Sequence, residues 1–130
     1  MAVRIVRLGA GRLAGEGVRI GTVRHPPRGV PKEKWAAQDF FDVWLPELSP
    51  GAEILSQFRA GEDTPGRREK FMAQFTREME KPPASRIIQL LAALSRTADF
   101  SVGCYCEDES HCHRLTLREI LARHGAVLAK

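Results

Sequence analysis

Residues 84–106 read ASRIIQLLAALSRTADFSVGCYC. In residues 84–98 the apolar positions recur at helical spacing, so this part predicts a helix with one buried face. Residues 100–106 form a short run typical of a buried strand. A second helix is predicted at 113–124, and Gly125 is expected to end it. A strand between two helices predicts packed α and β layers rather than a helical bundle.

The remaining segments are expected to complete the sheet and its helices. Strands are predicted at 3–8 and 18–23, a short helix at 31–37, a strand or packed loop at 39–45, and helices at 49–60 and 67–80. In the helix at 49–60, Ser49 is expected to act as the cap and Pro50 to take the first position. The length and pattern predict a single domain over residues 1–130.

The composition predicts a cytoplasmic protein with reduced thiols. No apolar run approaches the roughly 20 residues needed to span a membrane, and the N-terminus lacks a signal-peptide core. All 3 cysteines lie between positions 104 and 112, which is unlike the spread, even-numbered framework of a secreted protein. Thiols normally stay reduced in the cytosol.

Positive charge is concentrated at the start of the chain. Residues 1–34 contain eight Lys or Arg and two Glu, whereas residues 35–130 contain twelve basic and fourteen acidic residues. This distribution is compatible with a solvated basic face or with a basic wall for an anionic ligand. Residues 1–34 contain no aromatic side chain on which bases could stack, which argues against nucleic acid as a partner.

Residues 9–14, GAGRLA, match the spacing of a dinucleotide-binding fingerprint. That fingerprint binds pyrophosphate only where a helix follows, because the phosphates lie at the helix N-terminus. Here a strand is predicted at 18–23, which leaves no room for a helix. We therefore expect this segment to be a loop between two strands, and we assign no cofactor.

The segment CYCEDESHCHR, residues 104–114, carries the main candidate site. Ligands of α/β sheets bind beyond the carboxyl ends of the strands, and the unpaired N–H groups at a helix start lower a thiol pKa. Arg24, after the strand at 18–23, would reach the same rim if the two strands are parallel. We therefore predict a pocket for a small anionic ligand. Its predicted catalytic residues are Cys106, Cys112 and His113, and its predicted ligand contacts are Arg24, Arg28, Arg114 and Glu107.

Other interpretations of the cysteines stay open. The ligand types suit a zinc site built from Cys104, Cys106, Cys112 and either His113 or His111, although the spacing is not the usual paired pattern. A reversible Cys106–Cys112 disulfide would make a redox module, and cysteines also pack as small apolar groups. An enzyme is the first functional class, a metal- or ligand-binding module the second, and a nucleic-acid binder the third.

Three stretches together resemble a known family: VRIGTVRHPPRGV at 18–30, DVWLPELSP at 42–50 and VGCYCEDESHCHR at 102–114. The chain resembles domain of unknown function family 488, the YeaO-like proteins, from about Arg7 to Gly125. The resemblance implies a small Rossmann-like layered α/β domain with a short, largely parallel sheet flanked by helices. The positions that match its motifs are Arg24, Pro27, Arg28, Gly29, Trp44, Glu47, Leu48, Cys106, Glu107, Cys112, His113 and Arg114.

Overall fold

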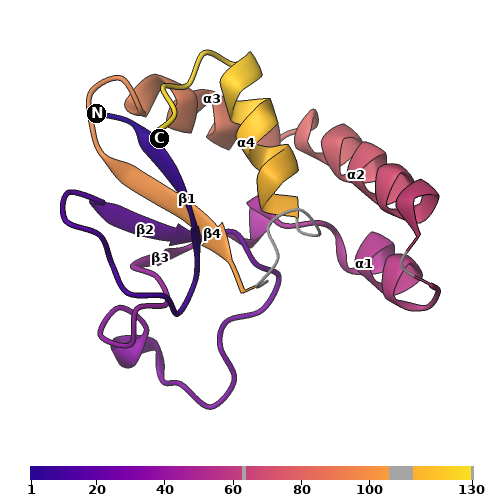
Figure 1. The fold of residues 1–130 in the computed structure, drawn as a ribbon, viewed down its shortest axis with the longest axis horizontal. Helices are drawn as coiled ribbons and strands as arrows, with labels where there is room; N and C mark the ends of the chain where they lie inside the picture. Colours follow the sequence, from indigo (N-terminus) through magenta and orange to yellow (C-terminus); the bar gives the residue numbers. More distant parts are fainter. Residues whose placement is uncertain (63, 106–112, 130) are drawn as a thin grey trace.

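A four-stranded parallel sheet lies at the centre of the protein (Figure 1). The structure, a computed structural model, describes residues 1–62, 64–105 and 113–129. The strands are β1 (Val3–Arg7), β2 (Val18–Gly21), β3 (Val43–Trp44) and β4 (Phe100–Cys104), in the spatial order β1-β4-β2-β3. Every residue of β4 is buried, as expected for an inner strand of a parallel sheet. The predicted α/β fold with a parallel sheet is confirmed.

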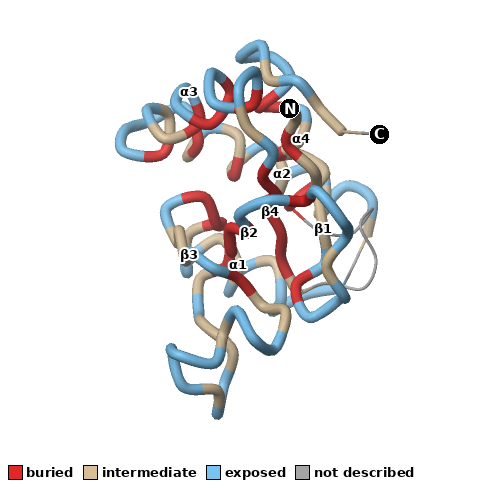
Figure 2. Tube along the Cα trace, turned by 90° about the vertical axis from the view of Figure 1, so that its left-hand side faces the viewer, coloured by how far each residue is buried: buried red, intermediate tan, exposed pale blue. Residues whose placement is uncertain are grey.

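The main core lies between one face of the sheet and the helices α1 (Ala52–Arg59), α2 (Pro65–Met79), α3 (Ala84–Leu94) and α4 (His113–Arg123). Figure 2 shows buried residues along β4 and within α3 and α4. The buried members of this core include Val3, Ile20, Phe100 and Val102 from the strands and Phe75, Ile88, Leu117 and Leu121 from the helices. None of the described helices is long and apolar enough to cross a membrane.

The opposite face of the sheet is covered by the segment between β2 and β3, which contains a short 3-10 helix, η1 (Lys32–Lys34). Phe41 is fully buried there, and its ring lies where a side chain at Gly21 would be. Trp35 packs against Phe41 edge to face, with ring centroids 4.9 Å apart. The glycine in β2 is therefore required by the packing of this second layer.

The start of α1 differs from the prediction. The helix begins at Ala52, with Gly51 as its N-cap residue, so assigning Ser49 and Pro50 to the helix start was wrong. The carbonyl groups of Ser49 and Pro50 instead accept hydrogen bonds from the Arg24 side chain. A contact between distant segments thus overrides a local helix-start signal.

The bounds of β3, the end of α3 and the start of α2 also differ from the prediction. Only Val43–Trp44 of the segment 39–45 pairs with β2, and α3 ends at Leu94 rather than near 98. The start of α2 lies at Pro65, because the Thr64 hydroxyl accepts a hydrogen bond from the Arg67 N–H at 3.2 Å. Such shifts leave the order of elements as predicted.

The glycine-rich segment 9–17 connects β1 to β2 without a helix, as predicted. Gly17 has a φ of 78°, and a side chain at this position would overlap the carbonyl oxygen of Asp99. Gly15 has a similar φ of 77° but open space around it, whereas Gly11 has neither constraint. The end of this loop is therefore held against the turn before β4.

A buried ion pair anchors the same loop, and the sequence pattern gave no indication of it. Glu16 is 3% exposed and Arg19 is 1% exposed. The Arg19 guanidinium donates Nε–H to Glu16 Oε2 at 2.7 Å and Nη2–H to Oε1 at 2.9 Å. Its Nη1 donates to the carbonyls of Ala10 and Asp39, both at 2.8 Å, and Ser101 donates its hydroxyl to Glu16. The network ties β2 to the loop and to β4.

Candidate functional site

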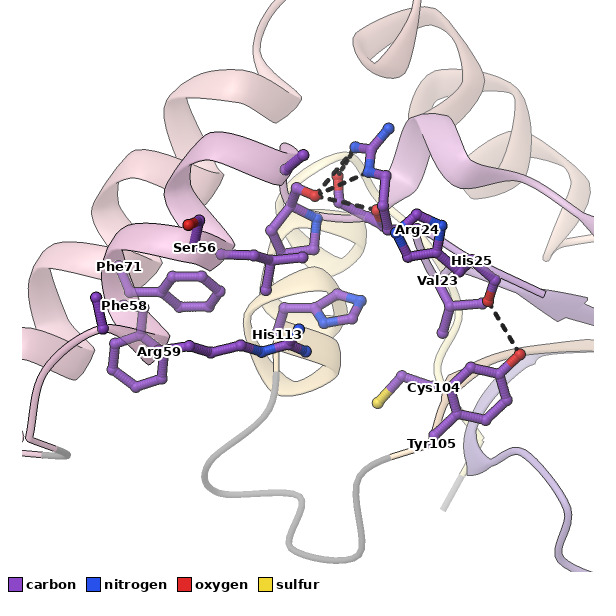
Figure 3. A pocket seen from close by; sticks show the side chains of 15 residues that line it. Val23, Arg24, His25, Ser56, Phe58, Arg59, Phe71, Cys104, Tyr105 and His113 are labelled. Carbon is purple, nitrogen blue, oxygen red and sulfur yellow. Dashed lines mark hydrogen bonds between the residues drawn. The ribbon is translucent and has the colours of Figure 1, made fainter. Parts of the chain in front are cut away.

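A cavity of about 720 Å³ lies beyond the carboxyl ends of β2 and β4, between them, α1, α2 and the start of α4 (Figure 3). This is the expected place for a ligand of a parallel α/β sheet. The residues that line it are Val23, Arg24, His25, Ser49, Pro50, Ala52, Leu55, Ser56, Phe58, Arg59, Ala60, Phe71, Cys104, Tyr105 and His113. None of these described lining residues is acidic.

Arg24 lies at the rim because it follows β2, which is parallel to β4. Its Nε donates to the Pro50 carbonyl at 3.2 Å, and its Nη2 donates to the carbonyls of Ser49 and Pro50 at 3.2 and 3.0 Å. These neutral partners fix the guanidinium without cancelling its charge. No acidic residue in the described ranges forms an ion pair with it, so Arg24 retains the capacity to bind an anion.

His113 is the first residue of α4 and is buried. Its Nε2 lies 2.8 Å from the carbonyl oxygen of Thr22. A carbonyl only accepts, so Nε2 carries the proton, and Nδ1 is the acceptor nitrogen of the neutral ring. Burial lowers the pKa of His113 to about 4; the nearby charge of Arg114 adds to this lowering, and the Thr22 hydrogen bond opposes it. The ring is therefore neutral at pH 7.

The lowered pKa of His113 predicts a loss of stability in mild acid. As the pH falls from about 6.5 to about 4, the unfolded chain takes up a proton that the folded chain does not, so folding becomes less favourable. Over this pH range, we expect the protonation of His113 in the unfolded chain to lower the free energy of unfolding by roughly 3 kcal/mol. Urea denaturation between pH 7 and pH 4 measures it.

His113→Gln removes the titrating group, so its free energy of unfolding should depend less on pH in this window than that of the parent protein. His25→Gln, at an exposed position, is the matched control for replacing a histidine with glutamine. If the free energy of unfolding changed with pH equally in the parent and in His113→Gln between pH 6.5 and pH 4, the lowered pKa of His113 would be contradicted.

The strand end adds Cys104 and Tyr105 to the cavity wall. The Tyr105 hydroxyl donates to the His25 carbonyl at 3.2 Å, and burial raises the Tyr105 pKa to about 12, so this group stays a neutral donor. Cys104 is 1% exposed and is disulfide-bonded. The sequence pattern predicted reduced thiols, with a Cys106–Cys112 disulfide as one alternative, so a disulfide that includes Cys104 differs from both predictions. In this state the Cys104 sulfur is not a thiolate.

The opposite wall comes from α1 and α2. Phe58 stacks on Phe71 with centroids 4.7 Å apart and an interplanar angle of 27°. Arg59 is exposed, and Figure 3 shows it extending from α1 toward His113. Sequence reasoning missed these residues, because the helical pattern of α1 does not indicate which of its faces meets the strand ends.

The predicted site residues fall into three groups. Arg24 and His113 line the same cavity. Arg28 is exposed and is not among the lining residues, and Arg114 is buried at 4% exposure beside His113 without lining the cavity.

The third group, Cys106, Glu107 and Cys112, lies outside the described residues. Their predicted roles as catalytic residues, ligand contact and zinc ligands therefore stay predictions. Within the described ranges, no group of three or more His, Cys, Asp or Glu side chains could hold a metal ion.

Comparison with known proteins places the chain in one family. Neither a curated protein nor a solved structure matches it. The family model described as "Active DUF488-N3 subclade" matches residues 3–125, which is nearly the whole chain. The resemblance noted in the sequence is therefore confirmed, and the protein belongs to the DUF488 family.

Proposed function

We propose that the cavity at the ends of β2 and β4 binds a small anionic molecule and that the protein is an enzyme acting on it. The observation that carries this proposal is the charge of the wall: Arg24 and Arg59 both line the cavity, and no described lining residue is acidic. The family model is described as an active subclade, and the description names no reaction.

The two arginines approach the cavity from different elements. Arg24 is fixed at the end of β2 by carbonyl groups, whereas Arg59 extends from α1 (Figure 3). Hydrogen bonds from guanidinium groups to an anion are charge-assisted and contribute about 1.5–3 kcal/mol each. His113 adds a neutral ring whose orientation is set by Thr22. The proposed catalytic residues are His113 with Cys106 and Cys112. Arg28 and Arg114 do not line the cavity, so neither is proposed as a ligand contact.

A charge placed on the cavity wall tests the proposal. Ser56 is exposed on α1 and lines the cavity, so Ser56→Glu should weaken phosphate binding roughly tenfold through like-charge repulsion. Arg59→Ala should weaken it by a similar factor, because a charge-assisted contact is lost. Isothermal titration calorimetry with inorganic phosphate measures both effects.

Gln57→Glu is the matched control, since Gln57 is the next residue of α1 and does not line this cavity. It introduces the same charge and should leave phosphate affinity within about twofold of the parent value. If Ser56→Glu and Gln57→Glu bind phosphate equally well, or if the parent binds none, the proposed anion site is wrong.

A redox-sensing module is the second proposed function, and a specific observation favours it over zinc binding. Cys104 lies on the cavity wall and is disulfide-bonded, whereas a cysteine that binds zinc must be a thiolate. A dithiol reductant would convert this disulfide to two thiols and itself become oxidised. The oxidation state of a wall residue would then depend on the surrounding thiol pool.

Alkylation separates the redox and zinc alternatives. We expect labelling of Cys104 to rise several-fold after reduction and to be unchanged by a chelator, read residue by residue with mass spectrometry. Labelling that rises with a chelator alone would instead support the zinc site of Cys104, Cys106, Cys112 and His113.

A further inference from the structure

We infer that the ligand of this cavity joins its anionic group to an apolar body about the size of one ring, and that this body lies on the wall formed by Leu55, Phe58 and Phe71. The inference rests on the proposed anion site and adds the chemical class of the molecule. Three observations carry it: the size of the cavity, the position of both phenylalanine rings on one side of it, and the direction in which the Arg59 side chain extends.

The cavity is larger than a simple anion requires. Its volume of about 720 Å³ lies within the range of sites that enclose drug-sized molecules. Inorganic phosphate would contact one part of such a wall and leave the rest facing water. A ligand that fills the cavity therefore carries more than its anionic group.

The two phenylalanine rings lie on one side of the cavity, whereas the strand ends on the other side add hydrogen-bonding side chains. Figure 3 shows Arg24, His25 and Tyr105 on the side of the strand ends and Phe58 and Phe71 on the side of α1 and α2. The rings of Phe58 and Phe71 stack on each other, and both contribute to the lining. Covering this apolar wall with an apolar group is favourable, and aromatic rings add preferred stacked or edge contacts.

Arg59 connects the two walls. Its backbone lies next to Phe58 in α1, and its side chain extends toward His113 (Figure 3). Long arginine stems commonly lie along apolar surface while the charged end reaches a polar region. A molecule with a ring on the α1–α2 wall would therefore place an attached anionic group near the guanidinium. This arrangement selects a linked anion and ring over either part alone.

Three probes test the inference on the unaltered chain by calorimetry: inorganic phosphate, phenyl phosphate and benzyl alcohol. We expect phenyl phosphate to bind at least about tenfold more tightly than inorganic phosphate, since the ring buries apolar surface, and benzyl alcohol to bind more weakly than phenyl phosphate. Equal affinities for phenyl phosphate and inorganic phosphate would overturn the inference while leaving the anion site intact. Benzyl alcohol binding as tightly as phenyl phosphate, or no binding of either phosphate, would overturn the proposed anion site itself.

A variant locates the ring. Phe58→Leu should reduce the preference for phenyl phosphate over inorganic phosphate about threefold or more, with little change in the affinity for inorganic phosphate. Leu90→Ala is the control, because Leu90 is 63% exposed on α3 and does not line the cavity. An unchanged preference in a folded Phe58→Leu protein would overturn the placement of the ring on this wall.

Discussion

Replacing Glu16 with glutamine should lower the free energy of unfolding by about 3–5 kcal/mol. The carboxylate is buried and forms two hydrogen bonds with the Arg19 guanidinium, at 2.7 and 2.9 Å. A neutral amide leaves the Arg19 charge buried without its counterion, and this uncompensated charge dominates the cost. Urea denaturation at pH 7 measures the loss.

Glu119→Gln is the matched control, because Glu119 is exposed on α4. We expect it to change the free energy of unfolding by less than about 0.5 kcal/mol. A loss of similar size in both variants, or a loss below about 1 kcal/mol for Glu16→Gln, would show that the buried pair contributes little.

The stability difference between the parent and Glu16→Gln should also depend on pH. Burial by itself raises the pKa of the Glu16 carboxyl, but hydrogen bonds from Arg19, Ser101 and the Leu13 N–H, with the Arg19 charge, lower it to about 2. A depressed carboxyl pKa stabilises the folded state above the ordinary value of 4.5, and this contribution is lost as the pH falls toward 2. The stability difference between the parent and Glu16→Gln should therefore shrink between pH 4.5 and pH 2. A constant difference across this range would contradict the assignment.

Three glycine-to-alanine substitutions in the loop before β2 should have graded effects, with Gly17→Ala the most destabilising at about 2–5 kcal/mol. Gly17 combines a φ of 78° with a close approach to the Asp99 carbonyl, so alanine adds both backbone strain and overlap. Gly15 has a φ of 77° and open space, so Gly15→Ala should cost only about 1–2 kcal/mol. Thermal and urea denaturation of the three variants measure the series.

Gly11 supplies the control within the same loop, because it has no positive φ and nothing within 4 Å of an added side chain. Gly11→Ala should be neutral or should stabilise the protein by up to about 1 kcal/mol, through the lower entropy of the unfolded chain. If Gly17→Ala were no worse than Gly15→Ala, the loop end would not be held against the turn before β4.

The helical and strand periodicities were sufficient to predict the order of elements and the α/β class. The burial pattern of β4 and the apolar face of α3 follow directly from residues 84–104. Placing Arg24 and His113 at one rim also followed from local signals, because each lies at the carboxyl end of a strand or the start of the next helix.

Arg59, Phe58 and Phe71 could not be assigned to the cavity from the sequence. They lie on helices whose local pattern predicts a buried stripe but not the neighbour that it meets. The buried Glu16–Arg19 ion pair could not be predicted from the sequence either, since a glutamate in a glycine-rich loop is normally exposed to solvent. Its burial depends on Ser101 of β4, which is 85 residues away along the chain.

Local periodicity, turn residues and family motifs in the chain were enough to predict a parallel α/β fold and the end of the sheet where a ligand would bind. The tertiary structure decided which walls enclose the cavity, where α1 begins and which charges are buried. The physical reason is the range of the interactions: backbone propensity and amphipathic spacing act over a few residues, whereas desolvation and ion pairing depend on segments that meet only after folding. Ser49 and Pro50 show the difference. Their residue types locally favour a helix start, but α1 begins at Ala52 and their carbonyl groups accept hydrogen bonds from Arg24.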